Sequence, residues 1–211
     1  VFSLILDQSN GDFIRMRGEG LLTGGIDKSG HVTLAGSYEI QEGSYEITFN
    51  FLQRQFQIQQ GSKIVWTGEP TKADLNVTAV YVANTTPLDL VANTIGPDAV
   101  TERTQYLQRM PFEVQLKLTG ELMKPTIGFD IVLPEDRNFR VPNDVIAVVN
   151  TRLGQIRQEP NEMNKQVFAL LLLNRFVTEN PFQSSGPSIT AEGFARQSAS
   201  ATSGSVRSRR P

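Results

Sequence analysis

The chain has 211 residues, of which 39% are hydrophobic, and its 20 Lys and Arg against 22 Asp and Glu give a net charge of -2. This balance argues against a general nucleic-acid binder, because neutralising phosphates requires a surplus of basic residues. The absence of cysteine excludes disulfides and cysteine-based catalysis or metal binding, and the single histidine, His31, excludes a multi-histidine metal site. The length fits one domain, or a large domain with an appendage.

From Val1 to about Leu133, apolar and polar residues alternate, which predicts β-strands joined by tight turns. We expect turns at 8–11, 27–30 and 41–43, where Gly follows Asn, Ser or Glu. The strands are expected at 1–7, 12–18, 20–27, 31–41, 43–52, 54–60, 62–68, 73–83, 112–120 and 126–133.

The alternation predicts a sheet with one apolar face and one polar face. If the sheet stays open, we expect the apolar side chains to line a groove that receives a ligand or a partner. The predicted lining residues are Val32, Leu34, Tyr45, Ile47, Phe49, Phe51, Phe56, Ile58, Ile64, Trp66, Leu75, Val77, Tyr81, Val114, Leu116, Leu118, Ile127, Phe129, Ile131 and Leu133.

No segment between the strands has the pattern of a helix that would cover this face. The one long insertion, 84–110, is polar and contains Pro87, Gly96 and Pro97. The predicted fold class is therefore mainly β: a curved single-layer sheet, antiparallel or mixed, that forms an open apolar trough, followed by two short C-terminal helices and a flexible tail. A sheet folded onto itself, as a sandwich or barrel, is the alternative.

The apolar period becomes helical after Pro142. Asn143 is the expected N-cap of a helix that ends before Pro160, and Asn161 that of a second helix to about Val177. The second helix is apolar nearly all round, so it either plugs the strand domain or meets a partner. The partner-binding candidates are Val167, Leu170, Leu171 and Phe176.

Three regions follow from these patterns: a groove domain at 1–141, a helical segment at 142–182 and a flexible tail at 183–211 that is rich in Ser and Gly and basic. The chain opens at Val1 inside a strand pattern, with neither Met nor a signal peptide, which we interpret as a fragment of a longer polypeptide. No apolar run is long enough to span a bilayer as a helix.

The sequence carries no motif of a catalytic or cofactor site. His31 follows a turn, where we expect a solvated side chain, and carboxylates such as Asp7 and Asp12 are scattered over turns and strand ends. A carbohydrate-active enzyme would need facing carboxylates beside Trp66, which the spacing does not indicate. We predict that the protein is not an enzyme and uses no metal or cofactor.

Five blocks of sequence between about Gly18 and Pro181 together resemble the C-terminal domain of the TamB family. The blocks are 25–47, 56–68, 73–81, 118–134 and 161–176. Within them, 130–134 and 173–176 look most like the versions found in Bacteroidota.

The resemblance implies a β-taco trough in the periplasm of a Gram-negative bacterium, within a protein anchored in the inner membrane and reaching the outer membrane. It implies phospholipid transport between the two membranes, assistance to outer-membrane protein assembly, or both. The implied partners are phospholipid or detergent acyl chains, an outer-membrane barrel protein of the TamA type and nascent outer-membrane proteins. The tail at 198–211 departs from the amphipathic end common in the family. The alternative is a self-packed structural or adhesive β-domain without a conduit.

Overall fold

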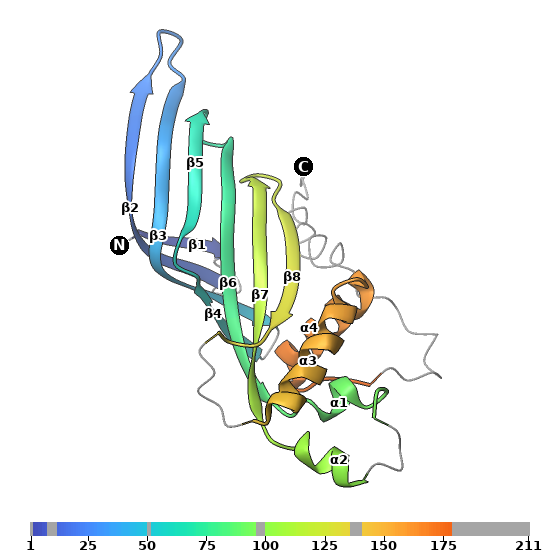
Figure 1. The fold of residues 1–211 in the computed structure, drawn as a ribbon. Coiled ribbons are helices and arrows are strands. Elements are labelled where there is room, and N and C mark those ends of the chain that lie inside the picture. The colour runs from blue at the N-terminus through green and yellow to red at the C-terminus, as the bar shows by residue number, and fades with distance from the viewer. Residues whose placement is uncertain (1, 8–11, 50–51, 96–99, 136–140, 179–211) are drawn as a thin grey trace, which may run out of the picture.

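A computed structural model of the chain describes residues 2–7, 12–49, 52–95, 100–135 and 141–178 (Figure 1). The fold is mainly β with two longer helices near the C-terminal end, which confirms that part of the prediction. The elements within these ranges are β1 (Phe2–Asp7), β2 (Asp12–Ile26), β3 (Val32–Phe49), β4 (Leu52–Ile58), β5 (Ser62–Gly68), β6 (Ala73–Thr85), α1 (Leu88–Val91), α2 (Val100–Gln105), β7 (Met110–Glu121), β8 (Thr126–Val132), α3 (Asn143–Ile156) and α4 (Pro160–Leu173).

The eight strands form one sheet in which the paired strands are antiparallel. Its order is β1-β2-β3-β4-β6-β7-β8, and β5 also lies between β3 and β6. β4 and β5 occupy one interrupted strand position, because β4 pairs with the later part of β3 and β5 with the earlier part. The strands therefore follow one another across the sheet in chain order, as in a meander. Short connections between consecutive strands favour this arrangement.

The predicted turn at 41–43 is wrong, because β3 runs through it without a break. The neighbouring expectations at 12–18 and 20–27 likewise merge into the single strand β2. The pairing of β2 with β3 shifts between Arg17, opposite Glu42, and Gly18, opposite Ile40. Gln41 is thus an extra residue on β3, a bulge that bends both strands. Gly and polar residues favour bulges and turns alike, so the sequence pattern did not separate them.

The predicted turn at 27–30 is confirmed. The backbone N–H groups of Ser29 and His31 donate to Asp27 Oδ1 at 2.8 and 3.0 Å, and Gly30 has φ 85°, a conformation that favours glycine. The predicted turn at 8–11 lies outside the described residues.

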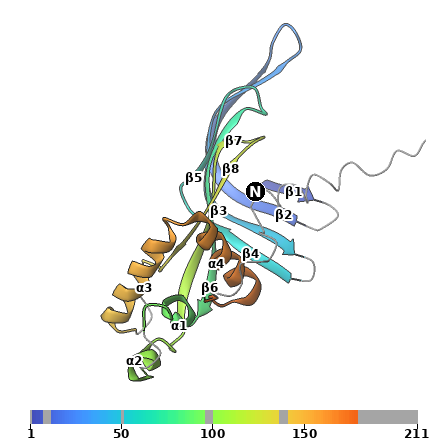
Figure 2. The same cartoon turned by 90° about the vertical axis from the view of Figure 1, so that its right-hand side faces the viewer.

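Two glycines allow the β2–β3 ribbon to coil closely on itself. A Cβ atom at Gly18 would overlap the carbonyl oxygen of Glu39, and one at Gly36 would overlap that of Leu21. Only glycine fits at such close backbone approaches. Seen from the side, the sheet curves, and its lower strands diverge into two branches (Figure 2).

Helix α4 lies between these branches, with β4 on one side and the lower end of β6 on the other (Figure 2). Arg54 Nε of β4 donates to the carbonyl oxygen of Leu171 at 2.7 Å, and Asn174 Nδ2 donates to the carbonyl oxygen of Asn84 of β6 at 3.3 Å. β4 pairs with β6 only at its last two residues, so the helix occupies the space where the two strands separate.

The expectation that no segment between the strands forms a covering helix is wrong for the lower half of the sheet, where α1 joins the C-terminal helices in the core. One hydrophobic core joins β4, β6, β7 and β8 to α1, α3 and α4. The insertion at 84–110 contributes Leu90 and Val91 of α1, which are 3% and 0% exposed. A helix of four residues is too short to show the 3.6-residue period of apolar positions, so the sequence pattern did not predict it.

The helix termini differ from the predicted ones. Asn143 is the first residue of α3 and makes no side-chain capping hydrogen bond, and α4 begins at Pro160 rather than after Asn161. Proline suits the first helical turn because that turn needs no backbone N–H. α4 ends at Leu173 because Asn174 adopts a left-handed conformation with φ 53°.

The strands and the C-terminal helices share one core, and the division at 141/142 and 182/183 stays a prediction. The predicted tail at 183–211 lies outside the described residues. In the ranges that the structure describes, no helix combines the length and the apolar character needed to cross a membrane.

Candidate functional site

Strand pairing places the predicted lining residues on one face of the sheet, called here the apolar face. Residues directly opposite each other on neighbouring strands share a face. One row across the sheet joins Tyr38, Ile64 and Leu75, and another joins Tyr81, Val114 and Ile131. The predicted residues on this face are Val32, Leu34, Tyr45, Phe56, Ile58, Ile64, Trp66, Leu75, Val77, Tyr81, Val114, Leu116, Leu118, Ile127, Phe129 and Ile131.

The other four predicted residues are not in this list. Leu133 directly follows β8 and packs, partly buried, against the main core. Ile47, Phe49 and Phe51 fall outside the part of the chain whose side chains the structure describes.

The lower part of the apolar face, called here the closed half, lies under the helices. Phe56, Val114 and Ile131 are fully buried, and Tyr45, Tyr81, Leu116 and Phe129 pack against the same core. The rings of Phe129 and Phe168 lie 6.1 Å apart, and those of Phe112 and Phe176 meet edge to face at 4.7 Å. These lining residues therefore belong to a packed core rather than to an open groove.

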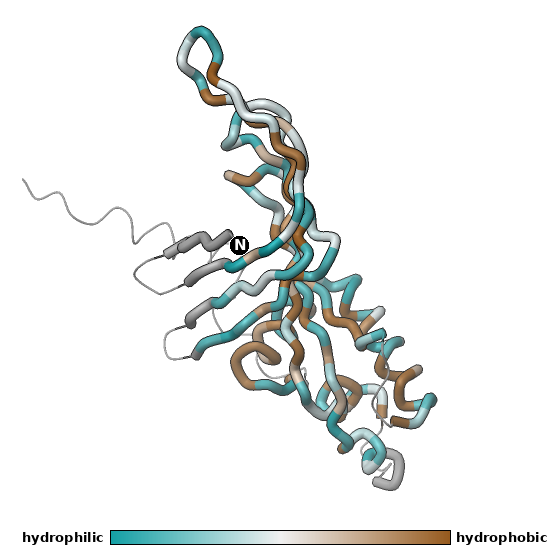
Figure 3. The backbone as a smooth tube through the Cα atoms, turned by 90° about the vertical axis from the view of Figure 1, so that its left-hand side faces the viewer, coloured by the Kyte–Doolittle hydropathy of each residue, from teal (hydrophilic) through white to brown (hydrophobic). Residues whose placement is uncertain are grey.

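The upper part of the apolar face, called here the open half, has no described helix packed over it. Ile26 is 74% exposed, Val32 57%, Leu22 44% and Ile127 49%. Among its partly covered members are Tyr38, Ile64 and Leu118, which surround a small cluster of Ile40, Ile58 and Val77. In Figure 3 the upper strands form a single layer in which hydrophobic and hydrophilic residues alternate.

The opposite face of the upper strands is mainly polar. Its paired rows include Glu19, Glu39 and Lys63, and further along Asn76 with Thr119. The two faces of the upper strands therefore differ: the open half is mainly apolar, and the opposite face is mainly polar.

Trp66 is the single tryptophan of the chain and lies on the open half. Its indole N–H donates to the carbonyl oxygen of Pro70 at 3.1 Å. Because the polar atom is satisfied inside the protein, the partly exposed ring can make apolar contacts without leaving a donor unpaired.

Sequence reasoning missed Leu22, Ile26 and Tyr38 as members of the open half. Pairing with β3 places Leu22 opposite Gly36 and Ile26 opposite Val32. The signal was present as an alternation in which every second residue from 18 to 26 is Gly, Leu or Ile. Glycines on the apolar face weakened that pattern because they add no hydrophobic side chain.

The partner-binding candidates on and after α4 are buried. Val167 and Leu170 are 0% exposed, Leu171 3% and Phe176 1%. The sequence predicted that this helix either plugs the strand domain or meets a partner. The burial of these four side chains in the closed half fits a plug. The exposed apolar residues of α4 are Leu172 and Leu173, which lie at its C-terminal end.

A buried amide fixes the chain that follows α4. Gln166 is 2% exposed, and its Nε2 donates to Glu162 Oε1 and to the carbonyl oxygen of Val177, both at 2.6 Å. Its Oε1 accepts the backbone N–H of Val177 at 3.0 Å. Buried polar groups need hydrogen-bond partners, so Gln166 fixes the backbone of Val177 in place. The neighbouring Phe176 is thereby held against Phe112 of β7.

Asp130 ties the end of α3 to the edge strand β8. Its carboxylate accepts Arg157 Nε at 2.7 Å and Lys117 Nζ at 3.1 Å, while Arg157 Nη2 donates to the carbonyl oxygen of Ile131 at 2.9 Å. Burial raises the pKa of Asp130, but the hydrogen bonds and charges of Arg157 and Lys117 outweigh it, so the pKa lies below its ordinary value.

We expect Asp130→Asn to lower the free energy of unfolding by about 1 kcal/mol at neutral pH, because both cations are partly exposed. A carboxyl whose pKa is lowered by folding stabilises the folded state at pH values above its pKa in the unfolded chain. This stabilisation is lost as the pH falls through its pKa in the folded protein. The difference between wild type and variant should be constant down to about pH 5 and shrink below about pH 4. Urea unfolding at several pH values measures it; a difference that grows on acidification would contradict the assignment.

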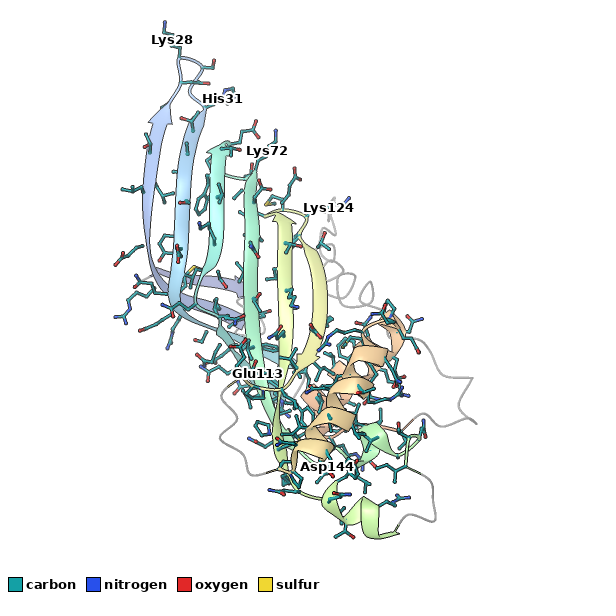
Figure 4. All side chains as sticks on the ribbon, viewed as in Figure 1. Lys28, His31, Lys72, Glu113, Lys124 and Asp144 are labelled. Atoms are coloured by element: carbon teal, nitrogen blue, oxygen red, sulfur yellow. The ribbon has the colours of Figure 1, made fainter. Side chains whose placement is uncertain are left out.

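The polar residues at the upper hairpin tips do not form a reactive centre. Lys28 and His31 lie on the β2–β3 turn, and Lys72 and Lys124 lie on the separate turns that follow β5 and β7 (Figure 4). The His31 side chain is 80% exposed, with Nδ1 3.5 Å from Asp27 Oδ2. Among the described residues, no group of three or more His, Asp or Glu could hold a metal ion.

An antiparallel sheet whose apolar face is covered by helices at one end and carries exposed apolar side chains at the other places the chain among mainly β proteins with a small helical part. A family model described as the TamB C-terminal domain matches residues 3–210. The chain belongs to the TamB C-terminal domain family, which confirms the resemblance. The Bacteroidota origin stays a prediction.

This family takes part in the translocation and assembly module and in outer-membrane biogenesis of the Gram-negative envelope, a transport and assembly role rather than catalysis. A search of curated proteins found no match.

Proposed function

We propose that the open half shelters phospholipid acyl chains and that the chain is a periplasmic module of a TamB-like protein carrying lipid between the inner and outer membranes. The observation that supports the proposal is the apolar side of the upper strands, where Leu22, Ile26, Val32 and Ile127 are exposed and no described helix packs. Leu34, Trp66 and Ile127 lie on that side, while polar residues occupy the other. In this proposal the β-taco is the curved open half, and the longer polypeptide is anchored in the inner membrane.

The hydrophobic effect is large enough for this role without a headgroup site. Transferring a chain of about a dozen methylenes from water contributes roughly 10 kcal/mol, at about 0.8 kcal/mol per methylene, before the cost of ordering the chain. Because the effect is non-directional, a lipid can slide along the open half without breaking specific bonds.

The closed half limits where such a chain can lie. Residues of α4 and of the segment after it occupy the continuation of the apolar face beside Phe112 and Phe129. An acyl chain on the open half therefore ends where α4 begins to cover the sheet. We propose that lipid leaves here toward an outer-membrane barrel partner of the TamA type, and that the same module assists assembly of outer-membrane proteins.

The experiment uses Trp66 as a contact reporter. Vesicles of phosphatidylglycerol and phosphatidylethanolamine with brominated acyl chains should quench its fluorescence, whereas the same lipids without bromine should not. Bromine quenches only near contact, so quenching reports acyl chains on the open half.

The matched control moves the indole to the other face. In Trp66→Phe combined with Thr67→Trp, the tryptophan lies on an exposed position of the polar face, and quenching should be lost. Equal quenching in both proteins would mean non-specific association. Absence of quenching in both would overturn the lipid proposal and favour a structural or adhesive β-domain.

A further inference from the structure

Arg54 of β4 is the one charged side chain that strand pairing places on the apolar face, among the residues whose side chains the structure describes. It lies opposite Ile47 and two residues before Phe56, so the strand turns it to that face. Its guanidinium carbon lies 5.6 Å from the centre of the Tyr81 ring. A charge on an apolar face needs partners, because taking it out of water is costly.

The partners of Arg54 within the described residues are carbonyl oxygens and not carboxylates. Its Nε donates to Leu171 at 2.7 Å, and its Nη1 donates to Gln53 at 3.1 Å. None of the ion pairs that the described residues form includes it. A guanidinium has five N–H groups, so those of Nη2 are left for an acceptor from outside this part of the chain.

A second arginine, Arg109, lies at the same end of α4. Its Nη2 donates to the carbonyl oxygen of Asn84 at 2.5 Å, and Asn174 Nδ2 donates to the same oxygen at 3.3 Å. Asn174 follows Leu171 by three residues, which is less than one helical turn. The two guanidinium groups therefore reach one end of one helix from β4 and from the segment before β7. Arg175 is exposed and adds a third positive charge there.

We propose that Arg54 and Arg109 bind the phosphate group of a phospholipid at the C-terminal end of α4, called here the arginine site. Guanidinium groups bind phosphate oxygens through paired N–H donors. Leu172 and Leu173 of the last helical turn are 45% and 56% exposed, which favours a phosphate that carries acyl chains. The inference rests on the proposed lipid-carrying function and adds a headgroup contact that the open half does not supply.

Capping of the helix alone does not require this arrangement. Asn174 already ends α4, with its backbone N–H on the carbonyl oxygen of Leu170 at 3.0 Å, and one cation complements a helix dipole. Arg152 offers a comparison, because its Nε donates to the carbonyl oxygen of Leu90 in α1 at 3.3 Å. Its Nη1 is bound to Gln155 Oε1 at 3.3 Å, whereas Nη2 of Arg54 has no described partner.

The experiment is isothermal titration calorimetry of the 211-residue chain with dihexanoyl phosphatidylglycerol, kept below the concentration at which it forms micelles. Glycerophosphoglycerol, the same headgroup without acyl chains, is the second ligand. We expect saturable binding of the lipid, weaker at higher ionic strength, and binding of the bare headgroup at least about tenfold weaker.

Two variants test the arginines. Arg109→Gln should weaken lipid binding about fivefold, because it removes a charged donor. Arg54→Lys keeps the charge but removes the paired donors, and should weaken binding at least about threefold. The matched control, Arg152→Gln, removes a guanidinium that also binds a helix carbonyl and should leave the affinity unchanged. Circular dichroism checks that each variant keeps its fold.

Equal affinity for the lipid and the bare headgroup would assign the arginine site to free phosphate compounds and overturn the lipid assignment. Unchanged affinity in Arg109→Gln and Arg54→Lys, an equal loss in Arg152→Gln, or no saturable binding would overturn the proposal. Trp66 lies on the open half, so its quenching by brominated lipid tests acyl-chain binding separately from these results.

Discussion

Replacing Ile131 with Asp is expected to unfold the closed half of the domain. Ile131 is 0% exposed and lies opposite Val114 beneath the helices. An aspartate there would bury a carboxylate with no compensating partner, which costs about 4 kcal/mol or more. Thermal unfolding by circular dichroism should show loss of the cooperative transition or a large fall in its midpoint.

The matched variant is Ile127→Asp, four residues earlier on the same strand and the same face. Ile127 is 49% exposed, so the free energy of unfolding should fall by only about 1 kcal/mol. Quenching of Trp66 by brominated lipid should nevertheless decrease, because the new carboxylate makes the open half less apolar. If both variants unfolded equally, the division into an open and a closed half would be wrong.

Replacing Phe176 with Ala is expected to lower the free energy of unfolding by about 3–5 kcal/mol, which covers the lost burial and the cavity left behind. The side chain is 1% exposed and its ring meets Phe112 edge to face at 4.7 Å. Urea unfolding followed by far-UV circular dichroism measures the change.

The control for Phe176→Ala is Leu173→Ala, three residues earlier at the end of α4, where the side chain is 56% exposed. Its effect should stay below about 1 kcal/mol. A similar loss in both variants would mean that the segment after α4 does not depend on its contact with β7.

The faces of the sheet could be predicted from the sequence because strand geometry has a period of two. Phe56 and Ile58, or Leu116 and Leu118, fall on the expected side, and β5 begins and ends where the alternation does. This information is local, since each residue's face depends on its immediate neighbours along the strand.

Which part of the apolar face is covered could not be predicted, because it depends on distant contacts. Phe129 and Ile127 carry the same signal in the sequence, yet only Phe129 packs against α4. The apolar character of α4 indicated burial or a partner without stating which strands it would meet. The bulge at Gln41 also depends on strand register, which side-chain alternation alone does not encode.

The bond between Arg54 and Leu171 joins residues 117 positions apart, whereas β2 and β3 meet through a short hairpin. Contacts that are close in sequence form early, and long-range contacts must wait for the intervening chain. The hairpin can therefore assemble while the rest of the polypeptide is still emerging, but Phe56 and Ile131 stay exposed to water until the last helix arrives. The half of the sheet that ends up best covered is therefore the last part to be covered during folding.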